Sequence, residues 1–320
     1  MKAIRVSEFG PPQVMYHEEI AVPKPGPGQV LVKIHAAGVN PVDTYIRAGI
    51  YPVKPKVPFT PGMDGAGVVA ALGKGVRRFK EGARVYTTAS VTGTYAEYAV
   101  CEESSVYPFP KRLSFSQAAA IGVPYATAYQ CLFHKARAKK GETVLIHGAS
   151  GGVGVAATQL ARAAGLKIIG TAGYKEGLEL VKKQGAHFVL NHRKEGYLDE
   201  VAKITKGRGV DLILEMIANI NLNKDLGILA LHGRVVVIGC RGTVEVNPRL
   251  MMGKDTTIMG MTIFNATKQE KSTIHRMLFR GFQNGRLKPV IGHELPLAEA
   301  ARAHHEVMEL PSYGKITLLP

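Results

Sequence analysis

Short apolar runs separated by glycine and proline characterise the first third of the chain. Four runs have the residue types and alternation typical of strands, and they lie at Ala3–Val6, Gln29–Ala36, Gly65–Gly73 and Ala83–Tyr86. A turn cluster, Pro23–Gly28, separates the first two. Several short strands punctuated in this way predict a small β-barrel or a partly open β domain.

The middle third changes to apolar strands that alternate with helices. The predicted strands are Thr143–His147, Lys167–Thr171, His187–Leu190, Val210–Glu215 and Arg234–Ile238. The predicted helices between them are Val155–Ala164, Glu176–Lys183, Tyr197–Lys203 and Leu222–Leu231. Alternation at this spacing predicts an α/β domain with a doubly wound parallel sheet.

The last sixty residues predict a return to the first domain. They contain a helix at Thr273–Gln283 and a terminal strand at Lys315–Leu319, which we expect to pair in the β-rich domain and make it discontinuous. The expected boundaries are therefore 1–122 for the β-rich domain, 123–262 for the parallel-sheet domain and 263–320 for the return. The longest uncharged run, Leu113–Phe133, is too polar for a membrane span and is interpreted as a buried domain junction.

Composition narrows the class of protein. With 46% hydrophobic and 21% charged residues among 320, the chain is not of the disordered type. Three scattered cysteines without a CxxC pair indicate a reducing compartment, and the N-terminus has no apolar signal segment, so we expect a cytoplasmic protein. The net charge of +16 is explained either by a solvated surface of scattered Lys and Arg or by attraction of a polyanion, including nucleic acid.

A glycine-rich turn between a predicted strand and a predicted helix carries the first chemical signal. The turn is Gly148–Gly154, and against the G-x-G-x-x-G template it has Ala149, Gly151 and Gly154 at the glycine positions. Gly151 allows the backbone to approach a pyrophosphate, and Gly154 allows close packing of helix and strand. The N–H groups of Ser150, Gly151, Gly152 and Val153 then point at the phosphates from a helix N-terminus, which predicts a dinucleotide site.

Basic residues suggest which dinucleotide binds. An NAD site has an acidic residue at the end of the second strand, but this chain has Gly173, Tyr174 and Lys175 there. The next strand ends at His192 and Arg193. Cationic donors suit a 2′-phosphate, so NADPH is favoured over NADH. Each residue also has an ordinary interpretation, as a helix-start lysine or as solvated loop side chains.

Longer motifs give the chain a family resemblance. They are Ala37–Arg47, Pro61–Gly67, His147–Gly154, Asn191–Arg193, Glu215–Asn219 and Gly239–Gly242. Through them the chain resembles the medium-chain dehydrogenase/reductases, and within these the quinone oxidoreductase branch called zeta-crystallin. The resemblance runs over almost the whole chain. It implies a Rossmann domain, a GroES-like substrate domain and a cytosolic homotetramer.

The resemblance also implies an activity and its residues. The activity is NADPH-dependent reduction of quinones, such as ortho-quinones, by one electron to the semiquinone. The implied cofactor contacts are Tyr45, Ser150, Gly151, Gly152, Val153, Gly173, His192, Asn221, Ile238, Gly239, Cys240, Arg241, Met261, Thr262 and Ile263. Asn221 follows the strand Val210–Glu215 and has a second interpretation as a helix cap.

No metal is expected. Zinc-dependent relatives have ligands at positions where this chain has Asn40, Met63 and Val123, with Asp64 at the carboxylate. Zinc needs three or four nitrogen, sulfur or oxygen ligands. Without metal, orientation of the quinone against the cofactor is sufficient. Asn40 and Tyr45 are the candidate catalytic residues, with Tyr51 beside them; Tyr45 could also be a core tyrosine.

Three alternatives remain open at this stage. RNA binding, which the family is associated with for AU-rich mRNA ends, agrees with the +16 charge, although no RNA-recognition motif is present. A structural, lens-type role is the second. A reductase of enones or enoyl thioesters from the same superfamily is the third. Elsewhere, the pair His304–His305 is interpreted as part of a solvated helix face.

Overall fold

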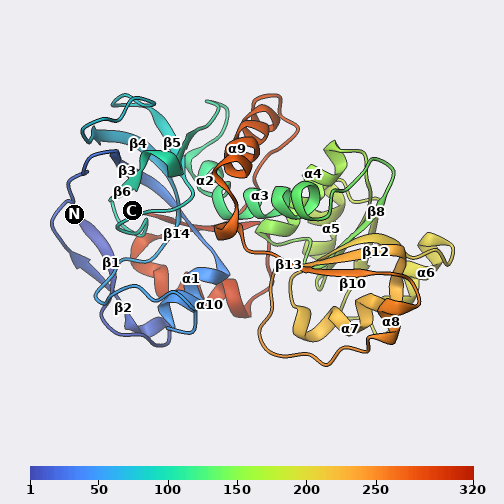
Figure 1. The fold of residues 1–320 in the computed structure, drawn as a ribbon. Helices are drawn as coiled ribbons and strands as arrows, with labels where there is room; N and C mark the ends of the chain where they lie inside the picture. Colours follow the sequence, from blue (N-terminus) through green and yellow to red (C-terminus); the bar gives the residue numbers. More distant parts are fainter. The chain divides into compact units, whose positions relative to one another are not determined.

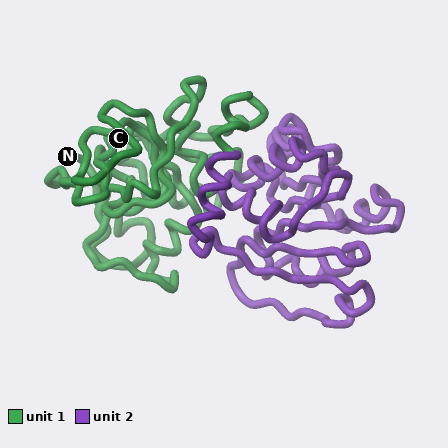
Figure 2. The backbone as a smooth tube through the Cα atoms, turned by 45° about the horizontal axis from the view of Figure 1, so that its top comes forward, with its two compact units in different colours: residues 1–123, 278–320 green, residues 124–277 purple.

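The computed structural model describes residues 1–320, which divide into two compact units. Unit 1 comprises Met1–Val123 and Leu278–Pro320, and unit 2 comprises Pro124–Met277. Figure 2 shows the chain leaving the first unit and returning to it. The sequence analysis placed the return at residue 263; in the structure, helix α9 (Lys268–Gln283) contributes residues to both units, so the division falls within it.

Unit 1 is built on a seven-stranded sheet. Its order is β14-β15-β3-β4-β5-β7, with β6 also paired to β3. The strands are β3 (Gln29–Val39), β4 (Asp64–Leu72), β5 (Arg84–Thr87), β6 (Tyr98–Glu102), β7 (Val106–Pro108), β14 (Ile291–Pro296) and β15 (Lys315–Leu319). A separate antiparallel pair is formed by β1 (Lys2–Val6) and β2 (Met15–Glu19). The helices are α1 (Pro41–Arg47), α2 (Phe115–Ala119) and α10 (Ala300–Glu309), with short 3-10 turns at Pro12–Val14, Glu103–Ser105 and Leu297–Glu299.

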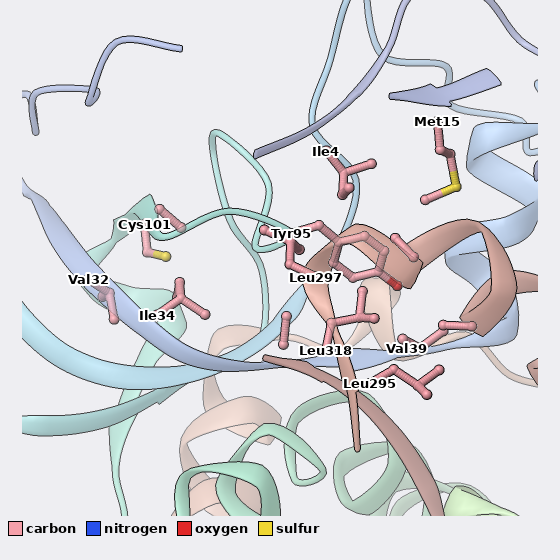
Figure 3. Packing of buried hydrophobic residues seen from close by; sticks show 14 of the residues in the cluster. Ile4, Met15, Val32, Ile34, Val39, Tyr95, Cys101, Leu295, Leu297 and Leu318 are labelled. Carbon is pink, nitrogen blue, oxygen red and sulfur yellow. The ribbon is translucent and has the colours of Figure 1, made fainter. Parts of the chain in front are cut away.

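The terminal strand joins this sheet as the sequence predicts. β15 pairs antiparallel with β3 and parallel with β14, so residues about 280 positions apart share one sheet. Its apolar side chains and those of β3 meet in a core that includes Ile34, Val39, Tyr95, Leu297 and Leu318 (Figure 3). Each such aliphatic side chain contributes about 1.5–3 kcal/mol when fully buried. The Tyr95 ring lies among these aliphatic side chains.

Unit 2 contains the predicted parallel sheet. Its order is β10-β9-β8-β11-β12-β13, and every pairing is parallel. The strands are β8 (Thr143–Ile146), β9 (Lys167–Ala172), β10 (Phe188–Asn191), β11 (Val210–Glu215), β12 (Leu229–Val237) and β13 (Thr257–Gly260). In chain order this is 3-2-1-4-5-6, the arrangement of a Rossmann fold. The strand order reverses between β8 and β11, where ligands bind in such sheets.

Helices connect and flank these strands (Figure 1). They are α3 (Gly122–Tyr129), which continues as a π-helical segment over Gln130–Lys135, α4 (Gly152–Ala163), α5 (Lys175–Gln184), α6 (Asp199–Thr205), α7 (Ala218–Ile228) and α8 (Arg249–Met252), with a 3-10 turn at Ile263–Asn265. Helix α7 was predicted over Leu222–Leu231, but it spans Ala218–Ile228. Strand β12 begins at Leu229, within the range predicted as helix, and His232 in this strand has a φ of 59°.

No helix has the length and apolar character needed to span a membrane.

Candidate functional site

The glycine-rich turn follows β8 and begins helix α4. Gly151 is the N-cap of α4, no side chain caps the helix, and its first turn contains no acidic residue. The first N–H groups of the helix therefore have no capping partner from a side chain, which suits an anion. A Cβ on Gly154 would lie 2.3 Å from the carbonyl oxygen of Gly148, so only glycine allows this close packing. The packing role predicted for Gly154 is confirmed.

The basic residues after β9 and β10 lie next to each other. The Arg193 guanidinium stacks on the Tyr174 ring, 4.5 Å from its centroid, and donates a hydrogen bond to the Tyr174 hydroxyl. A Cβ on Gly173 would lie 2.7 Å from His192 Nε2, so His192 packs against this glycine. Lys175 is exposed at the first position of α5. These contacts bring Gly173, Tyr174, His192 and Arg193 together, and Lys175 follows Tyr174 in the chain; we call Gly173, Lys175, His192 and Arg193 the basic pocket. Tyr174, to which the sequence analysis assigned no role, is the platform for its arginine.

The surroundings alter the protonation of His192. Desolvation lowers its pKa, and repulsion from His147 and from the Arg193 guanidinium lowers it further. His192 therefore donates to an anion mainly as a neutral imidazole near neutral pH. The charge of the pocket comes from Lys175 and Arg193.

A buried cluster that sequence reasoning missed lies at the switch point of the sheet. His147 Nε2 is 2.9 Å from Asp225 Oδ1 and 3.4 Å from Glu215 Oε2, and all three residues are almost inaccessible. Asp225 Oδ2 and Glu215 Oε2 have no N–H or O–H donor. Burial raises the pKa of each carboxyl to about 7. With both pKa values raised to this range, one proton held between the two carboxyl groups would supply the hydrogen that these oxygens lack.

The cluster also fixes the connection after β11. Glu215 Oε1 accepts hydrogen bonds from the backbone N–H of Ile217 and from Asn221 Nδ2, the latter at 3.3 Å. Asn221 lies inside α7, which starts at Ala218, so it does not cap the helix. The ligand atoms of His147, Glu215 and Asp225 lie within 4.8 Å of one another, close enough to hold a metal ion. A proton held between Glu215 and Asp225 would satisfy the same carboxyl oxygens without a metal ion.

The remaining predicted cofactor residues follow β12 and β13. The Gly239 carbonyl accepts from the N–H of Ala218, and a Cβ on Gly239 would lie 2.3 Å from the Met216 carbonyl oxygen. The Arg241 N–H donates to Asn219 Oδ1. Ile238 and Cys240 flank Gly239, and Met261, Thr262 and Ile263 come after β13. All predicted cofactor residues of unit 2 therefore follow the carboxyl ends of parallel strands, on one edge of the sheet.

In unit 1 the two candidate catalytic residues belong to helix α1: Asn40 is its N-cap, and Tyr45 lies within it. Tyr45 is half-buried, and its hydroxyl has no hydrogen-bond partner in the chain. Asn40, just before α1, is 3% exposed. Its Nδ2 donates to Asp64 Oδ2 at 3.0 Å, and its Oδ1 accepts from Lys315 Nζ. The amide oxygen of Asn40 is thus engaged within the protein, whereas the hydroxyl of Tyr45 is available to a ligand.

Comparisons with known proteins agree with the two units. Residues 26–111 match the family model of the alcohol dehydrogenase GroES-like domain, and residues 152–279 match the model of the zinc-binding dehydrogenases. A GroES-like sheet and a Rossmann sheet in one chain define a medium-chain dehydrogenase/reductase.

Individual relatives narrow the family. The human quinone oxidoreductase is 51% identical over 321 residues, covering 100% of this chain and 98% of the relative. The crystal structure of Escherichia coli quinone oxidoreductase complexed with NADPH has a TM-score of 0.92 at 30% identity, with 100% of both chains covered. An NAD-dependent alcohol dehydrogenase structure has a TM-score of 0.93 at 31% identity, also with full coverage. The chain belongs to the quinone oxidoreductase family, in the zeta-crystallin branch of that superfamily.

Proposed function

We propose that the protein reduces quinones with NADPH. The full-length identity of 51% to a quinone oxidoreductase is the observation that carries this proposal. The basic pocket after β9 and β10 supports the choice of cofactor, because residues 173–175 at the end of β9 include no carboxylate that would repel a 2′-phosphate.

The residues of unit 2 fit this cofactor. The uncapped start of α4 would hold the pyrophosphate, and Gly154 keeps the helix close enough to the strand for the turn to form. Lys175 and the stacked Arg193 would hold the 2′-phosphate. When bound, NADPH supplies the reducing equivalents.

In unit 1, Tyr45 would orient the substrate. Its hydroxyl has no partner in the chain and can donate a hydrogen bond to a quinone oxygen. Quinones need little further polarisation, so orientation is the main contribution required of the protein. We place the reaction in the cytoplasm, which the three free thiols Cys101, Cys131 and Cys240 support. The homotetramer, the preference for ortho-quinones, one-electron chemistry and RNA binding stay predictions.

The cofactor assignment is tested in the basic pocket. We expect Lys175→Ala and Arg193→Ala each to weaken NADPH binding by about tenfold or more, because each removes a charge-assisted contact, and to leave NADH binding within twofold. His192→Ala should have a smaller effect, since the imidazole is mostly neutral. Binding is measured by NADPH fluorescence and by kcat/KM with both cofactors.

Lys182→Ala is the matched control, because Lys182 is an exposed lysine in the last turn of the same helix. Equal use of NADPH and NADH by the parent, or an unchanged ratio in all three variants, would contradict the assignment. The substrate class is tested with the parent and NADPH on ortho-quinones, para-quinones, enones and enoyl thioesters. A rate only with the enones or thioesters would replace quinone reduction by the alternative reductase.

A further inference from the structure

Unit 1 holds a lysine ammonium group that is almost inaccessible. Lys315, the first residue of β15, is 4% exposed, and its Nζ lies 3.2 Å from Asp64 Oδ2, which is 0% exposed. Lys315 Nζ also donates to Asn40 Oδ1. A Cβ on Gly38 would lie 2.9 Å from Lys315 Cε, so the glycine in the neighbouring strand leaves the space that the lysine stem occupies.

Both oxygens of the Asp64 carboxylate accept N–H donors. Oδ1 accepts from the Val123 backbone N–H at 2.8 Å, and Oδ2 accepts from Asn40 Nδ2 at 3.0 Å as well as from Lys315. A Cβ on Gly122 would lie 2.1 Å from Oδ1. Three N–H donors converge on the two oxygens of Asp64, which is the pattern of an ionised carboxylate paired with an ammonium group. Burial raises the pKa of Asp64 and lowers that of Lys315, and the charge of each group opposes the shift of the other.

The ammonium also determines which way the Asn40 amide faces. Turning that amide over would place its NH2 group against the ammonium and its oxygen against the carboxylate, two repulsive contacts. Asn40 immediately precedes α1, the helix that carries Tyr45. Its backbone N–H donates to Asp43 Oδ2 of that helix at 2.9 Å. One ion pair thus connects the start of α1 with Val123 at the start of α3.

We propose that Lys315 is a positioning residue: paired with Asp64, it orients the Asn40 amide and sets the start of α1 for the reaction. The functional part of this proposal rests on the proposed quinone reduction. Asn40 and Val123 also stand at positions where zinc-dependent relatives have metal ligands, with Asp64 at the carboxylate position. In this chain the Lys315 ammonium group is the cation at these positions. It contacts Asn40 and Asp64 directly, and Asp64 in turn accepts a hydrogen bond from Val123.

The test compares Lys315→Met with the double variant Lys315→Met/Asp64→Asn. Lys315→Met leaves an unpaired buried carboxylate, so we expect the Tm at pH 7 to fall by on the order of 10 °C. The loss should grow as the pH rises, because the lone Asp64 has a raised pKa and must ionise. The double variant removes both charges and should recover at least half of the lost Tm and most of the pH dependence. The other titratable groups facing the pair, Asp43, Tyr86 and Tyr95, are common to all variants.

Activity distinguishes positioning from a purely structural role. In both variants kcat should fall at least tenfold, because neither has an ammonium to orient Asn40, while the NADPH dissociation constant stays within twofold. Recovery of kcat together with Tm in the double variant would overturn the proposal, as would an unchanged Tm and kcat in Lys315→Met. Lys33→Met, at an exposed strand lysine of the same unit, is the control and should match the parent.

A readout independent of turnover separates this proposal from the proposed function. The side-chain amide resonances of Asn40, observed by NMR after selective 15N-asparagine labelling, should shift in both variants and remain unchanged in Lys33→Met. An unmoved Asn40 amide overturns the proposal even if the enzyme is active. A parent that fails to reduce any quinone overturns the proposed function, and the Tm and NMR results still decide the role of Lys315. If Lys315→Met does not fold, the double variant, which leaves no charge at the pair, decides the outcome.

Discussion

His304 provides a direct test of the buried polar network of unit 1. The Arg47 guanidinium can only donate, so at 3.2 Å from His304 Nδ1 it requires that nitrogen to accept and to carry no proton. The proton of the neutral ring is then on Nε2, which donates to the Tyr95 hydroxyl at 3.1 Å. The Tyr95 hydroxyl in turn donates to Asp43 Oδ2. A second proton on His304 would point at a cation, so the imidazole is held neutral.

This arrangement predicts a loss of stability in mild acid. Burial, and then repulsion from Arg47, lowers the pKa of His304 from 6.5 to about 3. In the unfolded chain the histidine binds a proton below pH 6.5, whereas in the folded chain it does not until about pH 3. Its contribution to stability is therefore complete above pH 6.5 and decreases as the pH falls from there to about 3. At pH 5 the loss is about 2 kcal/mol, which corresponds to a Tm lowered by roughly 5 °C in a chain of this size.

The assay is a series of thermal unfolding curves between pH 5 and 8 for the parent, His304→Gln and His305→Gln. His305 is the exposed neighbour and serves as the matched control. His304→Gln removes the titrating group. The decrease in its Tm from pH 7 to pH 5 should therefore be about 5 °C smaller than the decrease in the parent. His305→Gln should keep the parent's slope. Equal slopes in all three proteins, or a His304 imidazole that titrates above pH 5 by NMR, would refute the reasoning.

Two further predictions concern the proposed cofactor and substrate residues. Gly154→Ala places a Cβ 2.3 Å from the Gly148 carbonyl oxygen, so we expect a loss of about 1–3 kcal/mol in stability and at least tenfold weaker NADPH binding, measured by fluorescence. The control Gly227→Ala, in a helix with no atom within 4 Å of the new Cβ, should stabilise the protein by about 0.5–1 kcal/mol. Unchanged NADPH binding and Tm in Gly154→Ala would show that the turn adapts. Tyr45→Phe should keep the parent's Tm and lower kcat/KM for quinones, because its hydroxyl has no partner to lose within the protein; a stability loss of about 1 kcal/mol with normal kinetics would instead identify a core tyrosine.

The sequence was sufficient where a pattern repeats over neighbouring residues. The alternation of strands and helices predicted the parallel sheet, and the turn at Gly148–Gly154 was found because its strand and helix are adjacent in the chain. The terminal strand was predicted from its own composition, although its partner β3 is far away. The ends of helices and strands were predicted less accurately than their existence. Helix α9 starts at Lys268 and not at Thr273, because Thr267 and Glu270 form a reciprocal pair of capping hydrogen bonds.

The interpretation of His304–His305 as a solvated face was wrong for one residue of the pair. His304 is 1% exposed, whereas His305 is exposed. A signal for this was present, since Ala300, Ala303, His304 and Val307 follow the i, i+3, i+4, i+7 spacing of one helix face, and His305 does not. Adjacent residues of a helix point about 100° apart, so one of two neighbouring histidines can be buried while the other is exposed.

Other groups could not be found from local patterns. The contact of His147 with Asp225 joins residues 78 positions apart, and that of Lys315 with Asp64 joins residues 251 apart. In the sequence, His147 and Lys315 are each a single polar residue next to an apolar run. Such a residue has the same composition around it as one at the solvated end of a strand. Only the topology makes these pairs meet: β3 lies between β15, which begins at Lys315, and β4, which begins at Asp64, and β11, which precedes α7 with Asp225, lies beside β8.

The cost of burying these groups suggests what they contribute. A buried ion pair rarely stabilises a fold more than apolar side chains of the same volume would, because desolvation consumes much of the Coulomb energy. An apolar replacement of Lys315 and Asp64 would fill the space, but it would leave the Asn40 amide and the Val123 N–H without directional partners. Likewise Glu215 holds the N–H of Ile217 and the amide of Asn221 in place. In both units the buried charges therefore fix the direction of particular donors next to the predicted site residues, which apolar packing cannot do.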